Sequence, residues 1–250
     1  MAGATALMLV ATMAGCGTKP SSTASPSGQQ TTITVFAAAS LEKSFTAIAK
    51  DFEAQNPQTK VTFSWAGSQT LVEQLANGAP ADVLATANTT TMDKAVQTGS
   101  VTDPQEFTTN RLTLITPAGN PAQITGLDAS LTGKNLVICA PAVPCGSATA
   151  KLAGLAGVTL TPKSEEQSVT DVKNKVISGQ ADAGIVYQPD AASAGDKVTT
   201  VAIRDSEKVV NRYPIALVKS SKNTTAATAF IAYVRSEAGQ KTLKSFGFGA

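Results

Sequence analysis

Two patterns of apolar residues alternate along most of this chain. In the first, short apolar or alternating runs are bounded by Gly, Pro or Asn, which is typical of β-strands. In the second, apolar residues recur every three or four positions, as on the buried face of a helix. The first pattern predicts strands at 32–40, 60–65, 81–87, 111–117, 134–140, 183–187, 197–203 and 213–219. The second predicts helices at 41–55, 71–78, 89–99, 147–157, 169–179 and 225–248.

Strands that alternate with helices predict an α/β protein with largely parallel sheets. The chain has 250 residues, of which 42% are hydrophobic, so it can bury the core of one large or two small domains. Its net charge is only +2 and no basic run occurs, which argues against a nucleic-acid partner. The absence of histidine removes the usual general base, the Ser-His-Asp and Cys-His catalytic sites and the commonest transition-metal ligand.

The N-terminal sequence MAGATALMLVATMAGC is apolar and rich in small residues, which indicates a targeting segment rather than part of the fold. Its end resembles a bacterial lipobox, in which a signal peptidase cleaves before the cysteine and the cysteine becomes lipid-modified. We therefore expect a signal peptide at 1–15 and a lipid anchor on Cys16. The Ser- and Pro-rich stretch 16–31 predicts a flexible tether that leaves the folded body outside the cytoplasmic membrane, anchored at its outer face. An ordinary signal peptide with a chance cysteine is the alternative.

Two further cysteines, Cys139 and Cys145, lie close together in the sequence VICAPAVPCGSAT. An exported protein meets an oxidising compartment, so we expect a disulfide between them, with two unpaired thiols as the alternative. A zinc site needs more ligands than two cysteines supply. Accordingly, we expect neither a cofactor nor a free metal cation.

The sequence TVFAAASLEKSF, residues 34–45, leaves a predicted strand through three alanines and reaches Ser40 where a helix begins. A helix that follows a parallel strand starts at the crevice above the sheet, where ligands of open α/β sheets bind. Small residues let the backbone approach a ligand, and the unpaired N–H groups and the helix dipole favour an anion. We expect Ser40 to be the N-cap of this helix, a common role that alone does not indicate a site.

The same arrangement recurs at three further helix starts. Ser68 begins the helix after strand 60–65, Cys145 lies at the start of the helix after strand 134–140, and Val169 begins the helix at 169–179. Tyr187 adds a phenol hydroxyl at the end of strand 183–187. Four helix N-termini and one phenol supply N–H and O–H donors without a counter-charge, which suits a small oxyanion. Ordinary caps and loops remain the alternative at each position.

Several motifs form a specific set in a specific order: FAAASL, WAGSQTL, GAPADVLATA, VPCG and AGIVYQPDA. Together they resemble the molybdate-binding proteins of bacterial ABC importers, over about residues 32–250. The resemblance implies a two-lobed periplasmic-binding-protein fold, type II-like, in which each lobe is a sheet flanked by helices and two crossover strands join the lobes. It also implies lobe one at 32–110 plus 215–250, lobe two at 111–214, and crossover strands at 111–117 and 213–219.

The resemblance implies five ligand-binding residues, which contribute hydroxyl or backbone N–H groups to the cleft. They are Ser40, Ser68, Cys145, Val169 and Tyr187. Two positions depart from the family pattern, because alanine is common where this chain has Cys145 and a more polar residue is common where it has Gly67. A contact made by the backbone N–H tolerates the first change.

A set of donors alone favours anions that carry no proton. Molybdate, tungstate and sulfate only accept hydrogen bonds, whereas buried hydrogen phosphate would leave its proton unpaired at a cost of about 1–3 kcal/mol. Asp171, in the first turn of its helix, is the residue that could accept such a proton. We therefore expect a monomeric solute-binding protein that captures molybdate, and tungstate by the same chemistry, and delivers it to an ABC permease in the membrane.

Three other functions stay open. The same fold could bind sulfate, phosphate or another small oxyanion. Ser40 paired with Lys43 could serve an enzyme as nucleophile, although the chain lacks histidine and AAAS is not a G-x-S-x-G elbow. A surface lipoprotein without a small ligand is the third, and its stability would not change when an anion is added.

Overall fold

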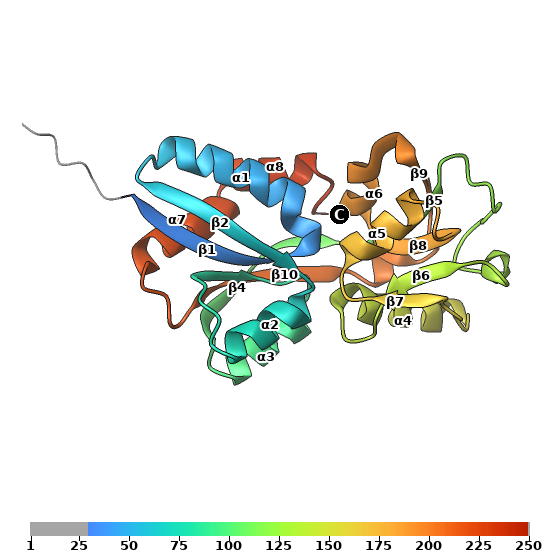
Figure 1. Cartoon of the computed structure of the whole chain (residues 1–250), viewed down its shortest axis with the longest axis horizontal. Coiled ribbons are helices and arrows are strands. Elements are labelled where there is room, and N and C mark those ends of the chain that lie inside the picture. The colour runs from blue at the N-terminus through green and yellow to red at the C-terminus, as the bar shows by residue number, and fades with distance from the viewer. Residues whose placement is uncertain (1–29, 250) are drawn as a thin grey trace, which may run out of the picture.

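The structure is a computed structural model that describes residues 30–249. The expected signal peptide at 1–15, the lipid anchor at Cys16 and all but the last two residues of the tether at 16–31 lie outside the described residues. Figure 1 shows two lobes side by side along the long axis, each built on one sheet with helices on both faces. The expected fold class is thereby confirmed.

Each lobe contains one five-stranded sheet. The first sheet has the order β2-β1-β3-β10-β4 and the second the order β7-β6-β8-β5-β9. The strands are β1 (Thr31–Ala38), β2 (Thr59–Ala66), β3 (Val83–Ala85), β4 (Val101–Asn110), β5 (Leu112–Pro117), β6 (Leu136–Cys139), β7 (Ser164–Glu166), β8 (Ala183–Tyr187), β9 (Val198–Val201) and β10 (Asn211–Val218).

Both sheets are mixed rather than largely parallel, which corrects the sequence-based expectation. β1, β2 and β3 are parallel, as are β6, β7 and β8. β10 runs antiparallel to β3 and β4, and β5 runs antiparallel to β8 and β9. The connectivity explains this, because β5 and β10 each enter their sheet from the other lobe. They therefore begin at the edge where the parallel strands end.

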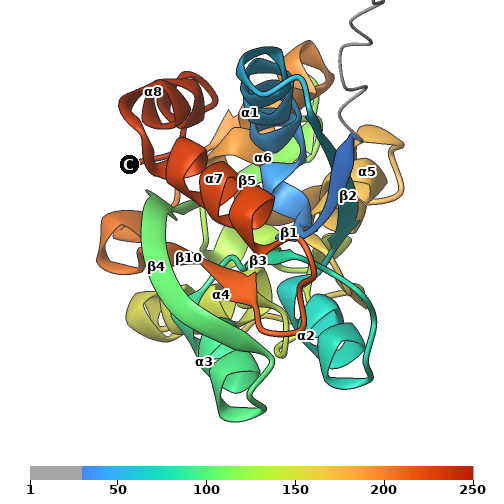
Figure 2. The same ribbon diagram turned by 90° about the vertical axis from the view of Figure 1, so that its left-hand side faces the viewer.

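Helices cover both faces of each sheet. In Figure 1, α1 and α8 lie above the first sheet with α2 and α3 below it, whereas α5 and α6 lie above the second sheet with α4 below it. Figure 2 shows that α7 lies on the same side as α1 and α8. Figure 2 shows the same separation for the first lobe seen from its end. The helices are α1 (Glu42–Gln55), α2 (Ser68–Ala76), α3 (Thr89–Gln97), α4 (Pro144–Ala156), α5 (Val169–Ile177), α6 (Gln188–Ala194), α7 (Thr224–Arg235) and α8 (Glu237–Ser245), with short 3-10 turns η1 (Ala39–Leu41), η2 (Ala129–Leu131), η3 (Gly195–Lys197) and η4 (Ser206–Lys208).

An aromatic cluster fixes α1 and α7 on the first sheet. The ring of Phe45 lies 5.6 Å from that of Phe107 and 6.1 Å from that of Phe230, between centroids. Phe52, two turns further along α1, lies 5.4 Å from Phe230. All four side chains are buried, as the helical spacing of Phe45 and Phe52 predicts for one face of α1. This packing holds the start of α1 at the cleft end of β1.

β4 is a strand that the apolar pattern does not predict. Its sequence VTDPQEFTTN is polar and contains Pro104, yet it forms the outer strand of the first sheet. An outer strand tolerates proline and exposed polar residues because one of its edges needs no partner, and the register of β4 against β10 shifts twice. After Asn110 the chain passes to β5 in the second sheet, and it returns before Asn211, the first residue of β10. β10 thus begins ahead of position 215, the expected start of the second part of lobe one.

Candidate functional site

The five candidate residues lie around one small pocket between the lobes, although they come from five different elements. The pocket has a cavity volume of only about 10 Å³. That is room for about one water-sized group, far below the roughly 300–1,000 Å³ of sites for drug-sized molecules, so the pocket suits only a small ligand. The other residues that line it are Ala38, Ala39, Ala66, Gly67, Ala87, Val143 and Pro144.

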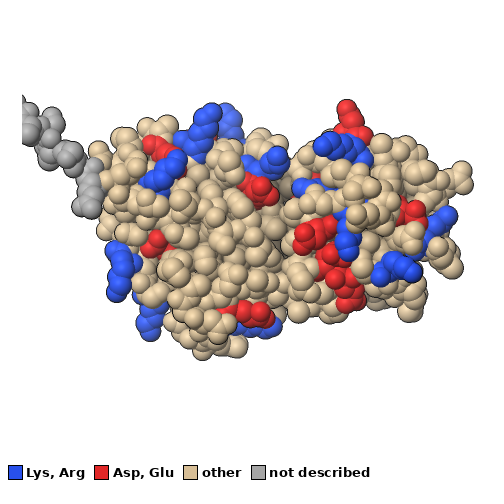
Figure 3. Space-filling model, viewed as in Figure 1, with Lys and Arg blue, Asp and Glu red and all other residues tan. Residues whose placement is uncertain are grey.

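None of the described residues that line this pocket carries a charge. The polar groups there are hydroxyls and the backbone groups of helix starts, which attract an anion through hydrogen bonds and helix dipoles. Figure 3 shows charged side chains of both signs scattered over one face of the two lobes, not gathered into one basic patch. Attraction of an anion to this pocket would therefore depend on neutral donors.

Ser40 lies at the cleft end of β1, but it is not the helix N-cap that the sequence predicts. The chain first tightens into the 3-10 turn η1, and α1 follows with Leu41 as its N-cap. The Ser40 side chain makes no capping hydrogen bond, and its Oγ lies 3.1 Å from Tyr213 Oη. The first N–H groups of a helical turn have no partner within the turn, so the backbone here can still donate to a ligand.

Ser68 is the first residue of α2, which begins earlier than the apolar pattern predicts, with Gly67 as its N-cap. The side chain is 1% exposed, and its Oγ accepts a hydrogen bond of 3.0 Å from the Ala87 N–H. Ala87 follows β3, so this bond ties the start of α2 to the end of the neighbouring strand. The Ser68 hydroxyl is thereby held at the pocket.

Cys145 is the second residue of α4, which begins at Pro144. Proline suits the first helical position because its missing N–H would have no partner there. A disulfide joins Cys145 to Cys139 at the end of β6. The next residue, Gly146, packs so closely that a Cβ there would lie 2.0 Å from the Ala140 carbonyl oxygen. The disulfide and the glycine together hold the start of α4 against the end of the strand.

Val169 is the first residue of α5, which Ser168 caps. Ser168 Oγ accepts a hydrogen bond of 3.2 Å from the Asp171 N–H and donates one of 2.7 Å to Asp171 Oδ2. Asp171 lines an outer hollow with Trp65 and Gln167, and it is not among the residues around the inner pocket. The carboxylate that could serve a protonated anion is thus held by Ser168 outside the pocket.

Tyr187 is the last residue of β8 and is 1% exposed. Burial raises the pKa of its phenol well above the usual value, and Tyr213 and Asp190 nearby add to this. The hydroxyl therefore stays protonated at neutral pH and keeps an O–H to donate. Tyr187 Oη accepts a hydrogen bond of 2.8 Å from Asn211 Nδ2, which also donates to the Ala87 carbonyl at 3.0 Å.

Asn110, Asn211 and Tyr213 support the site, and the sequence reasoning misses them. Asn110 Nδ2 donates to Tyr213 Oη at 3.3 Å, and Asn110 and Asn211 are direct partners across β4 and β10. The sequence does carry a signal, because an Asn-Arg pair stands at both passages between the lobes, at 110–111 and at 211–212. Apolar periodicity cannot reveal it, since the role of these residues arises from tertiary contacts.

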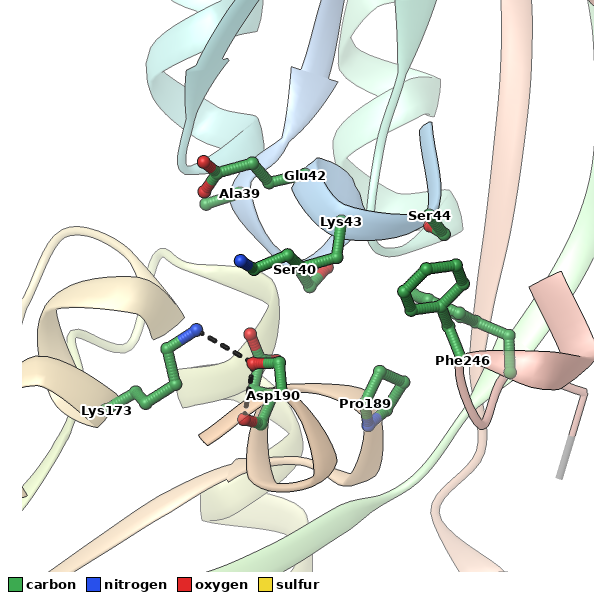
Figure 4. A pocket seen from close by; sticks show the side chains of 11 residues that line it. Ala39, Ser40, Glu42, Lys43, Ser44, Lys173, Pro189, Asp190 and Phe246 are labelled. Atoms are coloured by element: carbon green, nitrogen blue, oxygen red, sulfur yellow. Dashed lines mark hydrogen bonds between the residues drawn. The ribbon is translucent and has the colours of Figure 1, made fainter. Parts of the chain in front are cut away.

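A second hollow lies beside the pocket, between the start of α1 and α6. Figure 4 shows Ser40 and Lys43 on one side of it and Lys173 and Asp190 on the other. Asp190 is 4% exposed, and its Oδ2 has no hydrogen-bond partner among the described residues. Burial raises the pKa of Asp190 to about 7, while the charge of Lys173 and the Tyr187 backbone N–H lower it and Glu42 raises it further.

Neither a Ser40–Lys43 hydrogen bond nor a cluster of metal ligands is present in residues 30–249. Ser40 Oγ lies within hydrogen-bond distance of Tyr213, and no hydrogen bond joins it to Lys43 in this part of the chain. No group of three or more His, Cys, Asp or Glu side chains that could hold a metal ion occurs there. Within the same range, no helix combines the length and apolar character needed to cross a membrane.

Two α/β lobes around a small pocket of neutral donors define the class of two-lobed solute-binding proteins. The family model for "Bacterial extracellular solute-binding protein" matches residues 33–249. The chain belongs to this family.

Individual relatives agree with the family assignment. The molybdate-binding protein ModA of Mycobacterium tuberculosis is 45% identical over 250 residues, covering 98% of this chain and 96% of the relative. ModA of Haemophilus influenzae is 33% identical and covers 87% of this chain and 90% of the relative. The resemblance to molybdate-binding proteins that the motifs indicate is thereby confirmed. The periplasmic molybdate-binding protein of Azotobacter vinelandii has the same fold, with a TM-score of 0.75 and 19% identity over 86% of this chain and 98% of that chain.

Proposed function

We propose that this protein captures molybdate, and tungstate by the same chemistry, outside the cytoplasm and delivers it to an ABC permease. The observation that carries the proposal is a pocket without charged residues that donors from both lobes surround. The 45% identity to the Mycobacterium tuberculosis molybdate-binding protein, over nearly the whole chain, supports the choice of ligand. In this proposal the donors would be Ser40 and Ser68 from one lobe and Cys145, Val169 and Tyr187 from the other, all of which line the pocket.

The donor set matches an anion that has no proton of its own. Hydroxyls of Ser40, Ser68 and Tyr187 and backbone N–H groups at the helix starts would all donate to the ligand oxygens. Hydrogen phosphate would bury an unpaired proton at a cost of about 1–3 kcal/mol, because Asp171 is held by Ser168 outside the pocket. Tungstate has nearly the size and charge of molybdate, so the same donors serve both.

The position of the donors also explains how capture would work. Since they come from both lobes, the ligand is held fully only when the lobes are together, which is the hinge closure typical of such proteins. Lobe one at 32–110 plus 215–250 and lobe two at 111–214 would rotate about the two passages of the chain. The closed monomer would dock on the permease, and a lipid on Cys16 would keep it near the membrane.

Isothermal titration of the purified protein with molybdate, tungstate, sulfate and hydrogen phosphate tests this proposal. We expect tight binding of molybdate and tungstate, and at least about tenfold weaker binding of hydrogen phosphate, as the unpaired proton requires. Preferential binding of sulfate or hydrogen phosphate would replace the ligand and keep the oxyanion-binding function. No heat with any of the four anions would reject the proposal and favour a surface lipoprotein or an enzyme.

A further inference from the structure

Each of the three hydroxyls at the pocket has a hydrogen-bond partner in the surrounding scaffold. Ser68 Oγ is paired with the Ala87 N–H, Tyr187 Oη with Asn211 Nδ2, and Ser40 Oγ with Tyr213 Oη. A hydroxyl has one proton to donate and lone pairs to accept with. If its partner donates to a lone pair, the hydroxyl keeps its proton for a ligand. If its partner accepts the proton, the hydroxyl can offer a ligand only a lone pair.

The direction of the hydrogen bond between Ser68 and its partner, Ala87, is fixed. A backbone N–H only donates, so Ser68 Oγ accepts the 3.0 Å bond from Ala87 with a lone pair. The proton of the Ser68 hydroxyl remains available. Because Ser68 lines the pocket and is 1% exposed, a ligand in the pocket is the natural acceptor for that proton.

The partner of Tyr187 is an amide whose orientation is fixed by a backbone carbonyl. Asn211 Nδ2 lies 3.0 Å from the Ala87 carbonyl oxygen, which only accepts, so the nitrogen of the amide must face it. The same nitrogen donates to Tyr187 Oη at 2.8 Å. Tyr187 therefore accepts from Asn211, and its own proton is free for the pocket.

The partner of Ser40 is fixed through a chain of two residues. The Arg111 N–H donates to Asn110 Oδ1 at 2.8 Å, which turns Asn110 Nδ2 toward Tyr213 Oη, 3.3 Å away. Tyr213 thus accepts from Asn110. The 3.1 Å distance to Ser40 Oγ allows either hydroxyl to donate, and we assign Tyr213 as the donor because its buried proton needs an acceptor and Tyr187 Oη already accepts from Asn211. Ser40 accepts in turn and keeps its proton for the pocket.

We propose that Asn110, Asn211 and Tyr213 are positioning residues that impose donor polarity on the site hydroxyls and so exclude anions that carry a proton. The inference rests on the proposed function and deepens it. A hydroxyl without such a partner can rotate and accept a proton from the ligand as readily as it donates one. With the partner in place, that freedom is lost, and a pocket of hydroxyls discriminates against hydrogen phosphate as strictly as one of backbone N–H groups.

Tyr213 also interacts with Tyr187, whose pKa it raises, so in the empty pocket the Tyr213 oxygen is a second acceptor for the Tyr187 proton. A dianion is the stronger acceptor of the two, because hydrogen bonds to a charged oxygen are about twice as strong as those between neutral groups. Binding of the anion would therefore draw this proton into the pocket. The polarity of Tyr187 toward the ligand is unchanged, since Asn211 still donates to it.

Two substitutions in the full-length chain test the inference. Tyr213→Phe removes the hydroxyl next to Ser40 but keeps the ring, which packs against Tyr187 and Phe248. Asn211→Ala removes the donor to Tyr187. Tyr233→Phe is the matched control, because Tyr233 Oη accepts a hydrogen bond from Gln55, at 3.1 Å, in a different part of the first lobe. Thermal unfolding of each variant shows whether it is folded. If Asn211→Ala does not fold, Tyr213→Phe alone still tests the inference.

The measurement is the dissociation constant for molybdate, sulfate and hydrogen phosphate at pH 8. An anion that binds too weakly for direct titration is added at millimolar concentration, and its dissociation constant is obtained from its competition with molybdate. We expect each variant to bind molybdate and sulfate about tenfold more weakly, and hydrogen phosphate to change by less than about threefold. The ratio of molybdate affinity to hydrogen phosphate affinity would then fall in both variants. In Tyr233→Phe this ratio would equal that of the unaltered chain.

Three results would overturn the inference: equal losses for all three anions, unchanged affinities for all three, or hydrogen phosphate that competes in neither variant. Equal losses would mean that these residues only support the fold. Failure of the unaltered chain to bind molybdate would instead reject the proposed function, before any variant is compared. The two failures are therefore distinguishable.

Discussion

Single hydroxyls and backbone N–H groups respond differently to substitution. Removing a side chain deletes a hydroxyl donor, whereas an N–H survives almost any replacement at its position. Of the five candidates, Ser40, Ser68 and Tyr187 would contribute hydroxyls, while Cys145 and Val169 stand at helix starts where backbone N–H groups lack partners. Side-chain substitutions therefore test the first three positions and not the last two.

We expect Ser40→Ala and Tyr187→Phe each to weaken molybdate binding by about tenfold or more, because each deletes one buried donor to a charged ligand. Titration calorimetry on each variant, with thermal unfolding as a check on folding, measures the effect. If both variants bind molybdate as tightly as the unaltered chain, the site has been assigned to the wrong residues.

Asp190 gives the molecule a pH dependence opposite in sign to that of a carboxylate whose pKa is lowered by hydrogen bonds or an ion pair. Its pKa is raised by burial to about 7, from a model-compound value of 3.8. The folded chain therefore binds this proton more tightly than the unfolded chain, so folding stability falls as the pH rises from about 4 to about 7. Above pH 7 the Asp190 carboxylate is charged in both the folded and the unfolded chain. The folded chain then carries the whole free-energy cost of burying this charge.

We expect Asp190→Asn to stabilise the protein by about 4 kcal/mol at pH 8 and to leave its stability at pH 4 nearly unchanged. Urea unfolding at several pH values between 4 and 8 measures this. Glu53 provides the contrasting case, because burial raises its pKa but hydrogen bonds from Lys60 and Val61 outweigh this and leave it lowered. Glu53→Gln should therefore not stabilise the protein at pH 8, and a stability slope that persists in Asp190→Asn would contradict the assignment.

The five candidate residues around the pocket could be singled out from the sequence because each lies at or near the end of a strand or the start of a helix, and the family resemblance implies the same five. Asn110, Asn211 and Tyr213 could not, because their function depends on the pairing of β4 with β10, two strands far apart in the sequence. The N-cap role expected for Ser40 is wrong for a local reason, since the 3-10 turn before α1 shifts the cap to Leu41.

Two separate contacts hold the start of α4 in place, a disulfide and a close backbone contact at a glycine. The Cys139–Cys145 disulfide closes a short loop between β6 and α4, and Gly146 lets the helix pack against the backbone at Ala140. The disulfide contributes stability mainly by restricting the unfolded chain, which for so short a loop amounts to about 2 kcal/mol. The close contact of Gly146 is present in the folded state and does not depend on the sulfurs.

We therefore expect replacement of both cysteines by alanine to lower the free energy of unfolding by about 2 kcal/mol, while molybdate affinity changes less than about threefold. Urea unfolding of the unaltered chain with and without reductant, followed by calorimetry on the double variant, separates the two quantities. A loss of affinity as large as that of Ser40→Ala would show that the disulfide shapes the pocket.

At the level of elements, the sequence-based prediction succeeds for buried strands and amphipathic helices and fails at the edges. β8, from Ala183 to Tyr187, is predicted to the residue because it is apolar throughout. β4 is missed because an outer strand can be polar, and β7 because it contains only three residues. The antiparallel course of β5 and β10 follows from passage between lobes, which no local pattern records.

The lobes touch across the cleft at a glycine. Gln69 Nε2 of α2 donates a hydrogen bond of 3.1 Å to the backbone carbonyl of Gln167 in the other lobe. Next to it, a Cβ built on Gly67 would lie 2.2 Å from the same carbonyl oxygen. The backbone of Gly67, at φ −61° and ψ 142°, is one that any residue adopts. The need for glycine thus comes from the close approach of the Gln167 backbone of the second lobe and of the Gln69 side chain, and not from the backbone conformation of Gly67.

We expect Gly67→Ala to leave the lobes themselves intact but to prevent their full closure, so molybdate should dissociate faster and bind at least about tenfold more weakly. Gly154→Ala is the matched control, because a Cβ there meets nothing within 4 Å and alanine favours the helix by roughly 0.5–1 kcal/mol.

Solution scattering with saturating molybdate should give a larger radius for Gly67→Ala than for the control. Trp65, the only tryptophan of the chain and a lining residue of the outer hollow, reports the same closure by its fluorescence. Equal radii and equal affinities for the two variants would mean that closure does not require glycine at position 67, and that the contact between Gly67 and Gln167 yields without cost to binding.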